Sequence, residues 1–298
     1  MTAWIAADWG TSRLRLWAMD ADGEVIATVT SEAGMGRLSP PDFEPAFLAA
    51  AGDLVPDVGQ VEVLICGMAG ARTGWQEVSY AAVPCAPVTR PEGIATTDPR
   101  LSVRIIPGLS QSVPPDVMRG EETQIAGFLS DRPDHDGVIC LPGTHTKWVR
   151  VADGQVESFR TAMTGELFEL LSARSTLAGF TAEGWDDAAF DDACAEAMQS
   201  TGVLAADLFG LRAAALLNGF GPGAARARLS GLLIGHEVAA LRDLWRDRPV
   251  ALVGDDRLVD LYRRALQAAG QGAESFGAEA LTLRGLRLAH HHFGKDAS

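Results

Sequence analysis

The sequence predicts an α/β protein of two domains, with a mixed sheet duplicated in the two halves and a cleft between them. A strand, a Gly-Thr turn, a strand, an Asp-Gly turn and a third strand run over residues 4–30 and again over 138–160. The copies lie about 130 residues apart, which indicates duplication of a domain rather than a short repeat. At roughly 100–200 residues per domain, 298 residues suit two domains.

In the first half, the elements follow from hydrophobic alternation and turn residues. Apolar residues alternate with Arg13, Arg15 and Trp17, the period of a half-buried strand. Asp42 is a candidate cap for a helix that ends near Ala51. The proline-rich stretch 83–99 predicts irregular structure. The other predicted elements of this half are strands over 61–66 and 103–107 and a helix over 120–129.

Residues 133–137, Pro-Asp-His-Asp-Gly, break the pattern and predict the domain boundary. The expected domains are 1–133 and 134–298, and the last helix, within 277–298, is expected to pack back on the first domain. The second half is mostly helical after its three strands. Its further predicted elements are helices over 165–173, 187–199, 205–217, 224–245, 256–269 and 277–291 and a strand over 249–253.

Composition excludes several classes of protein. A net charge of −14 argues against nucleic acid or an anionic membrane as a partner, because both attract basic surfaces. No apolar run approaches the roughly 18 residues of a membrane span, and the first residues lack a signal-peptide pattern, so we expect a cytoplasmic protein. The cysteines have no zinc-type spacing, and we expect buried, reduced thiols at Cys66 and Cys140.

An acidic residue ends the first predicted strand, directly before a glycine turn. The turn Gly10-Thr11-Ser12 follows Asp8-Trp9. Gly10 allows a ligand close to the backbone, and successive turn N–H groups form a nest that binds anions. Asp8 is a candidate magnesium ligand, because Mg²⁺ takes one or two carboxylates together with water and phosphate. An ordinary hairpin with Asp8 as a turn former is the alternative interpretation.

The second half carries a matching turn after its own first strand. Residues 141–147 read Leu-Pro-Gly-Thr-His-Thr-Lys, and a third glycine turn, around Gly254, joins a strand to a helix. Two matching turns in duplicated halves can hold a polyphosphate between them, although a structural histidine and a solvated lysine remain alternatives. The candidate phosphate and nucleotide contacts are Gly10, Thr11, Ser12, Gly143, Thr144, His145, Thr146, Lys147 and Gly254.

These three turns, in this order, resemble the phosphate-1, phosphate-2 and adenosine motifs of the actin-like (ribonuclease H-like) ATPase superfamily. Further blocks along nearly the whole chain resemble the 2-dehydro-3-deoxygalactonokinase family. One departure is Ala71, where the pattern of this family usually has a hydroxyl side chain. The blocks that carry the resemblance are residues 5–12, 67–70, 119–124, 141–149, 163–167, 229–235 and 284–286.

The resemblance implies an ATP- and Mg²⁺-dependent kinase that phosphorylates the 6-hydroxyl of 2-dehydro-3-deoxy-D-galactonate. Actin-like sugar kinases place their catalytic acid at the start of a helix in the first half. By that position Glu121 is the candidate base that accepts the proton of the sugar hydroxyl, and Asp8 organises the metal. Glu122 is the alternative base, and both acids could instead only complement the helix dipole.

The substrate implied by the resemblance is a sugar acid, so its site must hold a carboxylate. Arginine binds carboxylate with two parallel hydrogen bonds, although each arginine of the motifs is also consistent with a surface charge. Trp75 is consistent with either a pocket wall or the core. The candidate substrate contacts are Arg13, Gly70, Arg72, Trp75, Arg119 and Glu122.

Two other functions remain open from the sequence. The Gly-Glu-Glu run at 120–122 also resembles exopolyphosphatases, in which an acid activates water, so a phosphoanhydride hydrolase is the first alternative. A nucleotide-binding module without catalysis, either a sugar sensor or an actin-like filament protein, is the second. The exposed face of the last helix is a candidate contact for a homodimer.

Overall fold

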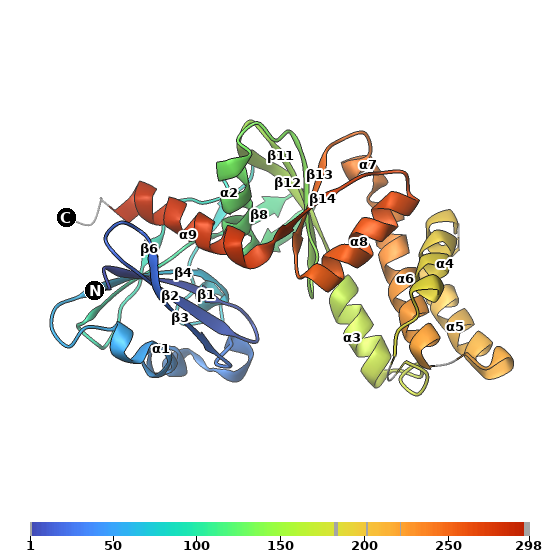
Figure 1. Cartoon of the computed structure of the whole chain (residues 1–298), viewed down its shortest axis with the longest axis horizontal. Helices are drawn as coiled ribbons and strands as arrows, with labels where there is room; N and C mark the ends of the chain where they lie inside the picture. The colour runs from blue at the N-terminus through green and yellow to red at the C-terminus, as the bar shows by residue number, and fades with distance from the viewer. Residues whose placement is uncertain (1, 182–183, 201, 221, 295–298) are drawn as a thin grey trace. The chain divides into compact units, whose positions relative to one another are not determined.

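The computed structural model describes residues 2–181, 184–200, 202–220 and 222–294. The chain divides into two compact units. Unit 1 comprises residues 1–135, 152–158 and 278–298, and unit 2 comprises residues 136–151 and 159–277. Figure 1 traces both units along the chain.

Unit 1 contains a mixed sheet of six strands. The strand β1 (Trp4–Trp9) pairs antiparallel with β2 (Leu14–Met19) and parallel with β4 (Val61–Gly67). The strand β2 also pairs antiparallel with β3 (Val25–Ser31). The three strands predicted over residues 4–30 are therefore confirmed as an antiparallel meander. Beyond β4 in the sheet lies β7 (Leu101–Ile105), which pairs parallel with β4. The short β6 (Glu92–Gly93) pairs antiparallel with β7 and forms the edge of the sheet.

A second sheet has the same order and lies mostly in unit 2, although residues 152–158 at the end of β11 and the start of β12 are assigned to unit 1. The strands β12 (Gln155–Ala162), β11 (Thr146–Ala152) and β10 (Gly137–Leu141) are followed in the sheet by β13 (Val250–Gly254) and β14 (Glu274–Gly277). As in unit 1, the first strand pairs antiparallel with the second and parallel with the fourth. The repeated order, a meander followed by two parallel strands, confirms the duplicated α/β fold.

A small third sheet was not predicted. It joins β5 (Tyr80–Ala82), β8 (Gly108–Ser112) and β9 (Pro115–Met118). Its strands are short and carry many polar or exposed residues, so hydrophobic alternation gives them little signal.

Helices cover both faces of the sheet in unit 1. On β1, Ile5, Ala7 and Trp9 face a core that contains Phe43 and Phe47 of α1 (Phe43–Ala51). Because strand side chains alternate, Trp4 and Ala6 face the opposite side, where they pack with α9 (Ala278–Phe293). Asp42 precedes α1, but its carboxylate accepts the N–H of Ser39 at 3.0 Å and closes a capping box over the preceding 3₁₀ turn. Asp42 is the N-cap residue of α1 and the helix ends at Ala51, as predicted, but the Asp42 side chain makes no capping hydrogen bond to α1.

The helix α2 (Glu121–Asp131) packs against α9 at very close range. A Cβ on Gly127 would lie 2.0 Å from the carbonyl oxygen of Leu281, and a Cβ on Gly285 would lie 2.0 Å from that of Thr123. Both positions therefore require glycine. The helix α9 is thereby held against the helix that begins with the two candidate acids.

In unit 2, α4 (Asp187–Gln199) and α5 (Leu204–Asn218) pack along the long helix α6 (Pro222–Ala240), as Figure 1 shows. A Cβ on Gly231 would lie 2.5 Å from the oxygen of Phe190, so glycine allows this close contact. The predicted helix over 224–245 is interrupted near Leu241, after which α7 (Arg242–Trp245) follows. The remaining helices are α3 (Thr164–Arg174) and α8 (Asp256–Ala268). Among the described helices, none is long and apolar enough to cross a bilayer.

Candidate active site

Asp8 lies near the carboxyl end of β1, on the face of the sheet that α9 covers. Its neighbours across the sheet are Arg15 on β2 and Cys66 on β4. A guanidinium nitrogen of Arg15 lies 3.6 Å from the Asp8 carboxylate, and Arg15 also binds Glu279 of α9 at 2.7 Å. Burial raises the pKa of Asp8; Arg15 opposes this, while the carboxylates of Glu279 and Glu121 reinforce it. The end of β1 therefore gathers more negative than positive charge.

The turn after Asp8 presents its side chains to solvent. The N–H of Gly10 donates to the carbonyl of Arg13 at 2.9 Å, and Thr11, Ser12 and Arg13 are exposed. Gly34 packs beneath the turn, where a Cβ would lie 2.2 Å from the backbone of Ser12. Gly34 thus packs against one side of the predicted anion-binding turn, and the side chains on its other side are exposed to solvent.

The two acids at the start of α2 have different surroundings. Glu122 is completely buried, and its carboxylate accepts the N–H of Gly120 at 2.6 Å and the hydroxyl of Thr123 at 3.1 Å. Burial, reinforced by the charge of Glu121, raises the pKa of Glu122 to about 8. Glu121 is half-buried and accepts the backbone N–H of Arg119 at 3.1 Å. Of the two, Glu121 is the acid with access to a ligand.

Arg119 points into the protein rather than toward solvent. It is 8% exposed, its Nη2 donates to the carbonyl of Val78 at 2.8 Å, and its guanidinium lies 4.2 Å from the centre of the Tyr80 ring. Its Nη1 is buried against Gly70, where a Cβ would lie only 2.7 Å away. Arg119 and Gly70 therefore hold the segment around residues 70–80 in place.

The other candidate substrate contacts are divided between surface and core. Arg72 is exposed, and the described part of the chain gives its guanidinium no hydrogen-bond or ion-pair partner. Arg13 is exposed and lies 3.7 Å from Glu32. Trp75 is half-buried and packs edge-on to the ring of Trp9, with ring centres 5.9 Å apart, so it belongs largely to the core. The arginines at 13 and 72 are the ones that a ligand could reach.

In unit 2, the turn between β10 and β11 is supported by the start of α3. The N–H of Glu166 donates to the carbonyl of Thr144 at 2.9 Å, and a Cβ on Gly165 would lie 2.3 Å from the oxygen of Gly143. Thr144 and His145 are exposed, and the His145 ring lies 2.6 Å from the Glu166 carboxylate.

Thr146 and Lys147 differ from the expectation for a phosphate-binding turn. Thr146 is completely buried, and its hydroxyl lies 2.8 Å from that of Tyr262. Lys147 is 5% exposed, and its ammonium donates to the carbonyl of His145 at 3.3 Å. Both side chains belong to β11 and are buried. The expected hydroxyl donor at Thr146 faces the interior.

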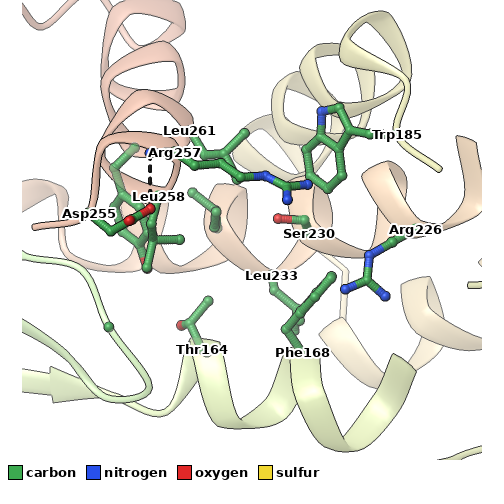
Figure 2. Close-up of a pocket in the computed structure, with 14 residues that line it drawn as sticks. Thr164, Phe168, Trp185, Arg226, Ser230, Leu233, Asp255, Arg257, Leu258 and Leu261 are labelled. Atoms are coloured by element: carbon green, nitrogen blue, oxygen red, sulfur yellow. Dashed lines mark hydrogen bonds between the residues drawn. The ribbon is translucent and has the colours of Figure 1, made fainter. Parts of the chain in front are cut away.

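A pocket of about 190 Å³ opens beside this turn, between α3, α6 and α8. Figure 2 shows the guanidinium of Arg257 over the ring of Trp185, and their centres are 5.2 Å apart. Arg226 similarly covers Phe168, 4.8 Å from its ring centre. These aromatic and basic side chains are spread over three helices and a loop, so no local sequence pattern predicts the pocket.

The third glycine turn lies at the edge of the same pocket. Asp255 lines the pocket and caps α8 by accepting the N–H of Arg257 at 3.1 Å. A Cβ on Gly254 would lie 3.4 Å from the carbonyl of Pro142, so this turn is a neighbour of the turn at Gly143. Tertiary structure therefore brings the two predicted motifs of unit 2 together.

The duplicated sheet, with a glycine turn after the first strand of each copy, defines an actin-like ATPase fold. Asp8 at the first turn and the acids at the start of α2 occupy the positions at which the sequence resembles actin-like sugar kinases. Comparison with known proteins assigns the family. A model of the 2-keto-3-deoxy-galactonokinase family matches residues 8–289.

Named relatives agree with this match. A protein of Rhizobium meliloti (strain 1021), named as a probable 2-dehydro-3-deoxygalactonokinase, is 40% identical over 95% of each chain. The 2-dehydro-3-deoxygalactonokinase of Escherichia coli (strain K12) is 33% identical over 98% of this chain and 99% of its own. A crystal structure from Sinorhizobium meliloti, assigned as the same enzyme, aligns with a TM-score of 0.86 at 37% identity, over 97% and 98% of the chains. The chain belongs to the 2-keto-3-deoxy-galactonokinase family.

Proposed function

We propose that the protein transfers the γ-phosphate of ATP to the 6-hydroxyl of 2-dehydro-3-deoxy-D-galactonate, with Mg²⁺. The observation that carries this proposal is the family match over residues 8–289. Both curated relatives are named as kinases for this substrate, which favours a kinase over the hydrolase and the sensing module that the sequence left open.

For ATP, we assign the nucleoside to the pocket of unit 2. Its apolar and aromatic walls suit a base, and the stacked Arg257 and Trp185 lie at its rim. Gly143 lines the pocket, so a nucleoside bound there has its phosphates next to the backbone of this turn. Exposed Thr144 and His145 are the side chains of the turn that can contact them.

For Mg²⁺, the fitting residue is Asp8. Its carboxylate is about 20% exposed and stands among further acids, so a cation would relieve the surplus negative charge there. Bound Mg²⁺ supplies charge neutralisation on the phosphates. In the corresponding turn of unit 1, the N–H of Gly10 already donates to Arg13, so we assign the phosphate contact there to the exposed Thr11 and Ser12.

For the sugar acid, we assign the base to Glu121 and the carboxylate contact to Arg72 and Arg13. Glu121 is half-buried at the start of α2, where its carboxylate can accept the proton of the attacking hydroxyl. Glu122 holds the backbone of Gly120 and thereby fixes the start of the helix. Arg119 is already bound to the carbonyls of Val78 and Ser79, so we assign it a supporting role.

The test is a coupled assay of ADP release over a panel of 2-keto-3-deoxy sugar acids and neutral sugars. We expect turnover only with a sugar acid, and a loss of roughly 100-fold or more in kcat for Glu121→Gln with an unchanged melting temperature. Glu77→Gln, on the exposed surface of unit 1, is the matched control and should behave as wild type. ATP hydrolysis that is independent of any sugar acid would contradict the proposal.

We place the reaction in the cytosol, since all four cysteines are free, as a reducing compartment would keep them. We retain the outer face of α9 as a candidate dimer contact, to be tested by the oligomeric state in solution.

A further inference from the structure

A buried carboxylate that the proposed mechanism does not use lies in the middle of α6. Glu237 is 7% exposed, and burial raises the pKa of its carboxyl group. Removing a carboxylate from water costs several kcal/mol unless its lone pairs are satisfied. A buried carboxylate therefore needs hydrogen-bond partners, and the partners of Glu237 indicate its role.

Three hydrogen-bond donors from three different elements converge on Glu237. The indole Nε1 of Trp148, on β11, donates to one carboxylate oxygen at 2.6 Å. The hydroxyl of Tyr262, on α8, donates to the other oxygen at 2.8 Å, and the hydroxyl of Thr164, the first residue of α3, donates to the same oxygen. All three donors are neutral, so hydrogen bonds rather than an ion pair stabilise the group.

These hydrogen bonds determine which group is the donor in a further hydrogen bond, between Tyr262 and Thr146. Tyr262 has one hydroxyl proton, and it is used toward Glu237. The 2.8 Å contact between Tyr262 and Thr146 therefore requires the Thr146 hydroxyl to be the donor. Thr146 and Trp148 are two residues apart on β11 and so lie on the same face, which is why both reach this network.

The network holds the walls of the pocket to the glycine turn. Thr164 and Tyr262 both line the pocket, and Figure 2 shows Thr164 at the start of α3. The next residue, Gly165, packs on the backbone of Gly143, and Thr146 ends the turn on its other side. One carboxylate thus connects β11, α3 and α8 around the turn.

We infer that Glu237 is a positioning residue, which sets the geometry of the nucleotide site by holding Thr164, Tyr262 and Thr146 through hydrogen bonds. The inference rests on the proposed function only in assigning the nucleotide to this pocket. It makes Glu237 a determinant of ATP affinity without contact to ATP. The sugar-acid site, assigned to unit 1, is independent of it.

The test uses Tyr262→Phe, which removes one hydroxyl and keeps the ring, and Glu237→Gln, which keeps the shape but places an amide donor among hydroxyl donors. We expect each variant to raise the KM for ATP and the Kd for ADP, measured by calorimetry without sugar acid, by about 10-fold. The KM for the sugar acid should stay within about two-fold. Val138→Ala, a core truncation at the far end of β10, is the control for lost stability alone.

Val138→Ala should lower the melting temperature and leave the KM for ATP unchanged. Unchanged ADP affinity in Tyr262→Phe would overturn the inference, and so would an equal rise of the KM for ATP in Val138→Ala. If Glu237→Gln fails to fold, Tyr262→Phe still decides the question. A wild-type protein that binds ADP but shows no sugar-acid turnover would contradict the proposed function instead.

Discussion

The buried acid at the start of α2 makes a quantitative prediction about stability and pH. Glu122 accepts the N–H of Gly120 and has a pKa raised from 4.5 to about 8 by burial, with the Glu121 charge as a second cause. The folded state therefore binds this proton more tightly than the unfolded state. The stability that results is fully present below pH 4.5 and is lost as the pH rises toward 8.

The size of the effect follows from linkage at about 1.4 kcal/mol per pKa unit. Between pH 5 and pH 8 the free energy of unfolding should fall by on the order of 3 kcal/mol from this group alone. Glu122→Gln keeps the volume and an acceptor for Gly120 but does not titrate. The variant should therefore lose less stability than wild type over this range.

The assay is urea unfolding, followed by tryptophan fluorescence at half-unit steps from pH 5 to pH 8 for both proteins. Other titrating groups contribute equally to both, so the difference between the two curves isolates Glu122. A difference that does not change with pH would refute the raised pKa. Glu121→Gln, unfolded in the same way, reports how much of the effect comes from the neighbouring charge.

Two further predictions concern packing and thiols. Gly285→Ala should destabilise the protein by about 2 kcal/mol or more, because its Cβ would lie 2.0 Å from the Thr123 oxygen, whereas Gly272→Ala, with open space around it, should be near neutral in thermal melts. In native protein, a thiol reagent should label the half-buried Cys85 first, because the other three thiols are buried and become accessible only on unfolding. Burial raises the pKa of all four thiols, so accessibility decides the order of labelling. Labelling of two or more equivalents at the same rate would contradict this.

The regular elements could be predicted because their patterns are local. Residues 61–66 are apolar except for Glu62, and the structure has β4 at Val61–Gly67. The helix predicted over 187–199 matches α4 at Asp187–Gln199. The small sheet of β5, β8 and β9 could not be predicted, because its short strands gain their stability from pairing with each other rather than from their own hydrophobic pattern.

Side-chain direction limited the prediction of the site. Motif position singled out both Glu121 and Glu122, but only the packing of α2 shows that Glu122 is inside and Glu121 half-buried. Thr146 was expected at the ligand, yet the alternation of β11 directs it to Tyr262. Glu237 carried no motif, because its three partners are distant in the sequence.

The sequence by itself determined the duplicated α/β fold, the two glycine turns and the family, since these depend on residues that are close together in the chain. Tertiary structure decided which motif residues point outward, formed the pocket from α3, α6 and α8, and joined Thr146, Thr164 and Tyr262 to one carboxylate. Local patterns depend on backbone geometry, which neighbouring residues set. The burial of a side chain and the meeting of side chains at one site depend on contacts between distant segments. Only the folded chain defines those contacts.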